Sequence, residues 1–271
     1  MNTMSAANPV VYEPAVRRPR NGLLKIFRKE AKYEFLKAIR LPIFAVSTIL
    51  LPVMFYVLFG LLLGNKGSGP VTTFLIATYG TFGVMGAALF GFGVGMTIER
   101  GQGWLELKRA SPMPPFAYFT AKVTTSMIFS AIISIVLLTM GLAFGGVHLR
   151  ATQMLRMVLV LMFGSIPFCA MGLAIGYFAK PNSAPAIVNL VYLPLSFLSG
   201  LWIPVQMLPK TLQQIATFLP PYHLSQLALD VIGVGRGESQ WWHIRALIGA
   251  TLLFLGLARI GYQRDQGKLY G

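Results

Sequence analysis

The sequence is poor in the residues from which catalytic and metal-binding sites are built. Its 271 residues include one cysteine, three histidines and eight acidic residues. Cys169 has no second cysteine with which to form a disulfide inside the chain. It has no HExxH motif and no GxxxxGKS or GxxxxGKT motif, so it shows neither a zinc-protease signature nor a phosphate-binding loop for ATP. A membrane-embedded enzyme is therefore disfavoured, no metal or cofactor is expected in this chain, and any ATP must be bound by another chain.

Ionisable residues are also missing from the middle of the long apolar runs. Glu99 and Asp230 are the acidic residues closest to the ends of these runs. A proton-coupled carrier would be expected to bury an ionisable group near the middle of the membrane. A secondary carrier or channel that acts without an ATPase is therefore disfavoured, although it remains the alternative function.

Hydrophobic residues are abundant, at 55% of the sequence against 11% charged residues. Together with a mean hydropathy of +0.65, this composition indicates an integral membrane protein. A helix needs about 20 residues to cross the hydrocarbon core, and backbone that faces lipid must be helical. We therefore predict an all-α protein with six transmembrane helices, at residues 41–65, 67–98, 123–150, 157–179, 181–209 and 241–262.

The basic residues, which give a net charge of +15, are unevenly distributed. The segment before the first run and the alternate loops hold 17 of the 23. By the positive-inside rule these segments are cytoplasmic, which predicts a multi-pass protein of the inner (plasma) membrane with both termini in the cytoplasm. Nucleic acid is not expected as a partner, because the chain has no soluble domain on which to gather a basic surface.

The segment before the first apolar run has two parts. Residues 1–21 are polar and contain proline, and we expect a disordered cytoplasmic tail there. Residues 22–41 are predicted to form a basic amphipathic helix in the membrane interface. Contact with anionic membrane lipid and a specific docking role both fit this helix, whose apolar residues recur at every fourth position: Leu23, Phe27, Ala31, Phe35 and Ile39.

A short charged segment, ERGQGWLELKRASPMPP at residues 99–115, interrupts the apolar runs. Residues 99–110 are long enough for about three helical turns, and the prolines that follow end the helix. Glu106 and Arg109 could brace one another, while Trp104 and Leu107 would share a face that needs cover. A solvated loop, the alternative, would need only charge, so the aromatic residue favours a docking helix.

A second unusual segment precedes the last apolar run. Residues 211–229 carry no charge but contain three glutamines, a histidine and the pair Pro220 and Pro221, which makes them a poor lipid-facing span. Two short helices hinged at these prolines fit better, since re-entrant elements pack against protein or line an aqueous path. We predict an external re-entrant helical hairpin at residues 203–240 that caps a pathway.

Polar residues inside the apolar runs are sparse. Tyr56, Asn189 and Tyr192 are among the main candidates for lining a cavity, although hydrogen bonds between helices would explain them as well. A substrate of such a cavity would be amphiphilic or apolar.

Two motifs give the sequence a family resemblance. SGLWIPVQMLPKTLQQIATFLPPYHLSQ, residues 199–226, resembles the signature of type-2 ABC exporter permeases, in which a Gly-x-x-x-Pro turn leads to Leu-Pro and two short helices. ERGQGWLELKRASPMPP is similar to that family's loop between the second and third spans. The sequence differs from the family at Trp104, Lys108 and Arg109, where family members more often have a threonine and a leucine-rich turn. This difference bears on the choice of partner. The resemblance covers residues 22–271.

The resemblance implies the permease subunit of an ATP-driven exporter for a hydrophobic or amphiphilic compound, such as a drug, a lipid or a lipid-linked glycan. It implies a homodimer, or a pair of like permeases, on two copies of a cytoplasmic ABC ATPase that bind ATP and Mg. It further implies that residues 99–115 form the coupling helix. The residues that would couple to the ATPase are Glu99, Arg100, Gly101, Trp104, Glu106, Leu107 and Arg109.

The resemblance also places a pathway at the interface of the two permeases, along the first, second and fifth spans. The implied pathway residues are Tyr56, Asn189, Tyr192 and Phe197. The re-entrant helices would form the external gate, with Pro204, Leu208, Pro209, Pro220 and Pro221 as its residues.

Overall fold

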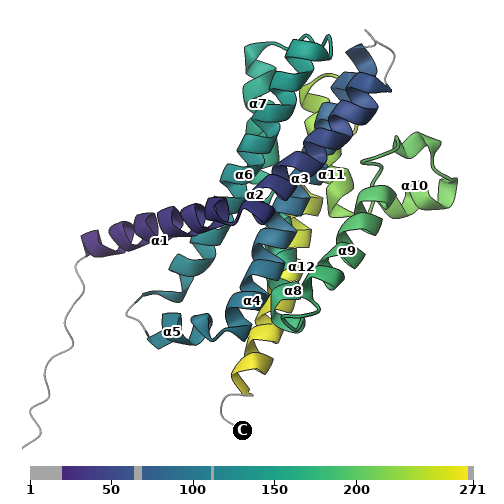
Figure 1. Ribbon diagram of the computed structural model, residues 1–271. Coiled ribbons are helices and arrows are strands. Elements are labelled where there is room, and N and C mark those ends of the chain that lie inside the picture. The colour runs from purple at the N-terminus through teal and green to yellow at the C-terminus, as the bar shows by residue number, and fades with distance from the viewer. Residues whose placement is uncertain (1–19, 64–68, 111–112, 268–271) are drawn as a thin grey trace, which may run out of the picture.

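The computed structural model describes residues 20–63, 69–110 and 113–267, and these residues form helices and turns without a strand. Most of the predicted disordered tail, residues 1–21, lies outside this range. Figure 1 shows a bundle of long helices, with shorter helices at its ends and sides. The prediction of an all-α, multi-pass membrane protein is confirmed.

Five helical segments are long and apolar enough to cross a membrane. They correspond to the first four predicted spans and the last one. Their helices are α2 (Pro42–Phe55) with η1 (Tyr56–Leu62); α3 (Gly69–Ala88), η2 (Leu89–Val94) and α4 (Gly95–Gly101); α6 (Pro115–Phe144); α7 (Ala151–Phe163) with α8 (Ile166–Phe178); and α12 (Gln240–Gly267).

The predicted fifth span, residues 181–209, contains a shorter apolar helix, α9 (Ala184–Leu198), of 15 residues. At about 1.5 Å per residue this helix is about 22 Å long, which is less than the hydrocarbon core of about 30 Å. The helix ends at Leu198 because Gly200, with φ = +74°, takes the left-handed conformation that closes a helix, and the chain then turns into η3 (Val205–Met207). The six-span count stays a prediction.

The α3 helix is the centre of the bundle, and small residues let its neighbours approach. A Cβ atom at Gly80 would lie 2.7 Å from the Leu161 side chain of α7, and one at Gly83 would lie 2.8 Å from Ile133 of α6. A Cβ atom at Gly86 would lie 2.8 Å from the hydroxyl of Tyr192 on α9. These close approaches explain why the second span carries glycine at intervals of three residues.

The first helix, α1 (Arg20–Arg40), crosses the bundle at a steep angle to α3 and α12 (Figure 1). It packs on α6, where the ring of Phe35 meets the ring of Phe129 edge to face at 6.1 Å. Ile39, assigned to the apolar face by the four-residue spacing, is exposed. Ala38 instead packs against the core, because 3.6 residues per turn rotate the buried face along the helix. The interfacial position of α1 stays a prediction.

Two short helices, α10 (Lys210–Ala216) and α11 (Pro220–Val231), occupy the segment before α12. Pro220 and Pro221 are the first residues of α11, where their missing amide hydrogens leave no helical bond unmade. The α11 helix packs on α3, α7 and α12, and most of its side chains are buried. The α10 helix lies to the side of the bundle near α9 (Figure 1). That this pair is external and re-entrant stays a prediction.

Candidate functional site

The second span ends in the charged segment that the sequence singles out. Glu99 and Arg100 belong to the last turns of α4, and the chain then turns through Gln102 and Gly103 into α5 (Trp104–Ala110). Gly103 has φ = +76°, a conformation that favours glycine. The expected single helix of about three turns over residues 99–110 is therefore wrong, because this left-handed residue divides it into the end of α4 and the two-turn α5.

Glu99 faces into the protein, with 6% of its surface exposed. Its carboxylate accepts hydrogen bonds from the Tyr118 hydroxyl at 2.6 Å and from Lys122 Nζ at 3.0 Å. Lys37 of α1 also donates to it. A carboxylate taken out of water needs such partners, because an unpaired buried charge costs several kcal/mol. Glu99 is thus a structural anchor at the point where α4, α6 and α1 meet.

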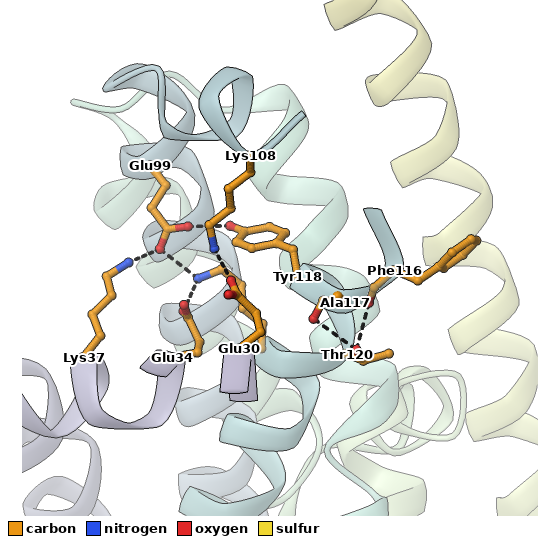
Figure 2. A network of polar contacts seen from close by, with 10 residues as sticks. Glu30, Glu34, Lys37, Glu99, Lys108, Phe116, Ala117, Tyr118 and Thr120 are labelled. Atoms are coloured by element: carbon orange, nitrogen blue, oxygen red, sulfur yellow. Dashed lines mark hydrogen bonds and ion pairs between the residues drawn. The ribbon is translucent and has the colours of Figure 1, made fainter. Parts of the chain in front are cut away.

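Two further ion pairs extend this anchor along α1. Lys122 Nζ donates to Glu34 at 2.6 Å, and Lys108 of α5 donates to Glu30. The Lys108 ammonium also lies 4.4 Å from the centre of the Tyr118 ring, a cation–π contact. Figure 2 shows Glu30, Glu34 and Lys37 pointing from α1 toward Glu99 and Lys108. We name this network the charged junction; its members are Glu30, Glu34, Lys37, Glu99, Lys108, Tyr118 and Lys122.

Arg100 ties the same end of α4 to the other side of the bundle. Its guanidinium donates to the carbonyl oxygens of Tyr177 at 2.6 Å and Ala179 at 2.5 Å, at the end of α8. It also lies 3.5 Å from the carboxylate of Asp265 on α12. Gly101 faces Pro181, whose Cγ would lie 2.4 Å from a Cβ atom at that position. These contacts fix the direction in which α4 delivers the chain to α5.

The outer surface of α5 is apolar and uncovered. Trp104 is 54% exposed and Leu107 is 66% exposed, whereas Leu105 is buried against the core. Glu106 is also exposed. The side chain of Arg109 lies outside the described residues, so its expected contact with Glu106 stays a prediction. A short helix thus presents an aromatic and an aliphatic side chain to the surroundings.

The predicted coupling residues therefore fall into two groups. Glu99, Arg100 and Gly101 hold α4 in place, and Glu99 makes its bonds within the chain. Trp104, Glu106 and Leu107 are available on the surface. The structure brings both groups to one end of the bundle, where the second group presents exposed side chains and Glu99 of the first group is buried.

The predicted pathway residues do not meet at one point in the chain. Tyr192 is buried, donates to the Phe82 carbonyl at 3.1 Å and stacks on the Phe82 ring at 4.6 Å. Tyr56 is also buried, but against α3 and Gly141 of α6. Asn189 and Phe197 instead point out of the bundle from α9.

Tyr192 borders an apolar cavity of about 390 Å³ beside α2. A second cavity, of about 190 Å³, shares Leu41, Phe44 and Phe90 with it and reaches Glu99 and Lys122. The two cavities together follow α2 from the charged junction to Pro52. This groove is apolar along its length and charged at one end, a distribution that matches an amphiphile.

The predicted gate residues lie around η3 and α11. Leu208 and Pro221 are buried, Pro204 and Pro220 are half-buried, and Pro209 is exposed at the start of α10. Near them a small cavity of about 170 Å³ is lined by apolar and polar side chains, and the polar ones include Gln226 and Arg236. In the part of the chain that the structure describes, no cluster of three or more histidine, cysteine or acidic residues could hold a metal ion.

The sequence reasoning missed the acidic members of α1. It assigned this helix a basic surface and an apolar face, whereas Glu30 and Glu34 form pairs with Lys108 and Lys122. Their spacing of four residues places them on one face of a helix, and this was a usable signal. Their partners are 78 and 88 residues away in the sequence, so spacing could not have identified them.

Known proteins have similar sequences. Residues 27–232 match the model of the ABC-2 type transporter family. The chain is 26% identical over 238 residues to the Bacillus subtilis (strain 168) protein named "Putative transport permease YvfS", which covers 87% of this chain and 96% of that protein. It is 28% identical over 188 residues to "Inner membrane transport permease YhhJ" of Escherichia coli (strain K12), which covers 63% of this chain. This chain spans about half of that second relative, since 46% of its length is matched.

Proposed function

Because the chain belongs to the ABC-2 type transporter family, we propose that it is the permease subunit of an ATP-driven exporter. It supplies the transmembrane part and binds no nucleotide itself. Two copies of a cytoplasmic ABC ATPase bind ATP and Mg, and a second permease completes the pathway. The observation that carries this proposal is α5, a short helix that exposes Trp104 and Leu107 while Lys108 attaches it to α1 through Glu30.

The charged junction explains how α5 could transmit force. Lys108 connects α5 to α1, and Glu99 connects the end of α4 to α1 and α6. A push on α5 by the ATPase is therefore shared by three helices and does not bend a loose loop. Closure of the ATPase dimer would move the second and third spans together, as coupling requires.

The groove along α2 supports a hydrophobic or amphiphilic substrate, such as a drug, a lipid or a lipid-linked glycan. Its walls are apolar, and charge is found only at the end near Glu99 and Lys122. Asn189 and Phe197 face outward from α9, where a second permease would turn them toward a shared pathway. The segment at residues 203–240 then acts as the external gate, and both termini are cytoplasmic.

The proposal is tested by co-expressing this chain with a candidate ABC ATPase from the same organism and purifying the two together. Trp104→Ala combined with Glu106→Lys removes the exposed aromatic group and reverses one charge on α5. We expect this double variant to insert into the membrane normally and to retain severalfold less ATPase, or to hydrolyse ATP without export. Trp241→Ala is the matched control, since Trp241 is also exposed but lies at the start of α12, the end of that helix far from Asp265. Normal ATPase binding and normal export by the double variant would refute the assignment of α5.

A further inference from the structure

Two buried histidines meet between α11 and α12. His223 of α11 and His243 of α12 are 2% and 0% exposed, and their Nδ1 atoms lie 2.9 Å apart. The Nε2 atom of His223 lies 2.9 Å from the carbonyl oxygen of Thr217. The Nε2 atom of His243 lies 3.5 Å from the carboxylate of Glu238 and has no hydrogen bond.

These distances fix the protons of the neutral pair. A carbonyl oxygen only accepts, so His223 carries its proton on Nε2 and its Nδ1 is an acceptor. His243 must then donate from Nδ1, which leaves a lone pair on its Nε2. That lone pair faces a carboxylate, which also only accepts, so two acceptors oppose each other. Burial and the neighbouring His243 lower the pKa of His223 to about 4, in agreement with a neutral His223.

One added proton would remove this opposition between two acceptors. Bound to Nε2 of His243, it would donate to Glu238 and create an imidazolium–carboxylate pair. A second proton cannot be accommodated, because both Nδ1 atoms would then carry hydrogen and the two N–H groups would oppose each other. The pair can therefore hold one positive charge and not two.

The other charged groups around the pair have defined places. Asp230 of α11 lies near enough to act on His243, and Tyr222 donates to Glu238 at 2.9 Å. Arg236 reaches both Tyr222, at 3.3 Å, and Glu238, at 3.9 Å. Within the described residues, no charged side chain of α3, α7 or α10 forms an ion pair or hydrogen bond with these groups.

We propose that His223, His243 and Glu238 form a proton-binding site that latches α11 to α12 when it is occupied. Glu238 lies in the segment between the two helices, so the new pair with His243 pulls this segment onto α12. Tyr222 and Arg236 are attached to the same carboxylate, and Arg236 borders the small cavity beside η3. Occupancy of the proton site is thus connected to a residue that lines this cavity. The effect on export rests on the proposed role of this segment as the gate, whereas the proton site does not.

The first test is nuclear magnetic resonance of the full chain in lipid nanodiscs with 15N-labelled histidine. The chain has three histidines, and His148 is exposed and outside the cluster, so His148→Gln assigns the reference signal. We expect His223 and His243 to take up one proton together. Glu238→Gln should lower the affinity for this proton about tenfold, a shift of about one pH unit, without moving the titration of His148. Independent titration of both histidines, or an unchanged midpoint in Glu238→Gln, would overturn the site.

The second test measures the latch itself. Ala228, which is buried on α11, is replaced by cysteine in a Cys169→Ser background, and its maleimide labelling rate is measured at about pH 7.5 and about pH 5.5. The same cysteine with His243→Gln corrects for the pH dependence of the thiol. Acidification should slow labelling severalfold more in the protein that keeps His243 than in the His243→Gln protein. An equal change of the labelling rate in both proteins would overturn the latch. Both tests need no ATPase, so a failure of the proposed export function would leave their outcome unaffected.

Discussion

Replacement of Lys122 by methionine tests how strongly the charged junction stabilises the protein. Lys122 and Lys37 both pair with Glu99, but their surroundings differ. The Lys122 side chain is 3% exposed and also pairs with Glu34, whereas the Lys37 side chain is 48% exposed. Methionine keeps much of the length of the lysine stem and removes the charge. The same substitution at the two positions therefore compares a buried and a solvated partner of one carboxylate.

The expected magnitudes follow from this difference in burial. Lys122→Met leaves two carboxylates, Glu34 and the buried Glu99, without their central cation. Breaking a buried ion pair from one side costs about 3–5 kcal/mol, while a surface pair contributes at most about 1 kcal/mol. For a chain of this size such a loss lowers the melting temperature by on the order of 10 °C. Lys37→Met should lower it by no more than about 3 °C.

Unfolding can be followed through Cys169, the chain's one cysteine, which is buried. A thiol-reactive fluorophore becomes bright when heat exposes this side chain. The double variant Glu99→Gln, Lys122→Met should recover part of the lost stability, because it no longer buries an uncompensated charge. Equal melting temperatures for Lys37→Met and Lys122→Met would contradict the description of Lys122 as the centre of the network.

Three further outcomes follow from particular positions. Asn189→Leu should change stability by less than about 0.5 kcal/mol but alter the rate or selectivity of transport, since Asn189 is exposed on α9; a large loss of thermal stability would instead reveal a buried hydrogen bond. Gly101→Ala should destabilise the protein by about 1–3 kcal/mol, because the new Cβ would lie 2.4 Å from Pro181 Cγ, and thermal unfolding measures it against Gly249→Ala, where nothing lies within 4 Å. Replacement of Pro220 and Pro221 by alanine should alter transport or basal ATPase activity without preventing insertion, and wild-type transport would argue against the gate assignment.

The sequence predicted the features that depend on composition and local pattern. Charge-free runs identified the five helical segments of the described residues that can cross a membrane, because length and hydropathy alone decide this property. The prolines at 220 and 221 correctly marked the start of a helix. Trp104 and Leu107 were expected on one exposed face of a short helix, and both are exposed on α5.

Features that depend on contacts between distant segments could not be predicted from the sequence. The turn at Gly103 interrupts the helix that was expected over residues 99–110. The pattern of apolar residues gives no information on the sign of φ at this glycine. In the sequence, Glu30 and Glu34 resemble ordinary surface charges on a basic helix. Their roles depend on lysine partners from α5 and α6, which only the fold brings next to them. The meeting of His223 with His243 likewise required the packing of α11 on α12.

The continuous helical run through α3, η2 and α4 is longer than a membrane is thick. At about 1.5 Å per residue, the distance from Gly69 to Glu99 along this run is about 45 Å, against about 30 Å for the hydrocarbon core. If Gly69 lies at one surface of the core and the run stands perpendicular to the membrane, Glu99 lies about 15 Å beyond the other surface, at the level of lipid headgroups and water. In that arrangement the ion pairs of the charged junction form outside the hydrocarbon core, where bringing charges together costs less free energy. A tilt imposed on the end at Glu99 reaches the glycines at the middle of the bundle through η2, a π-helical segment of six residues at which the run can bend.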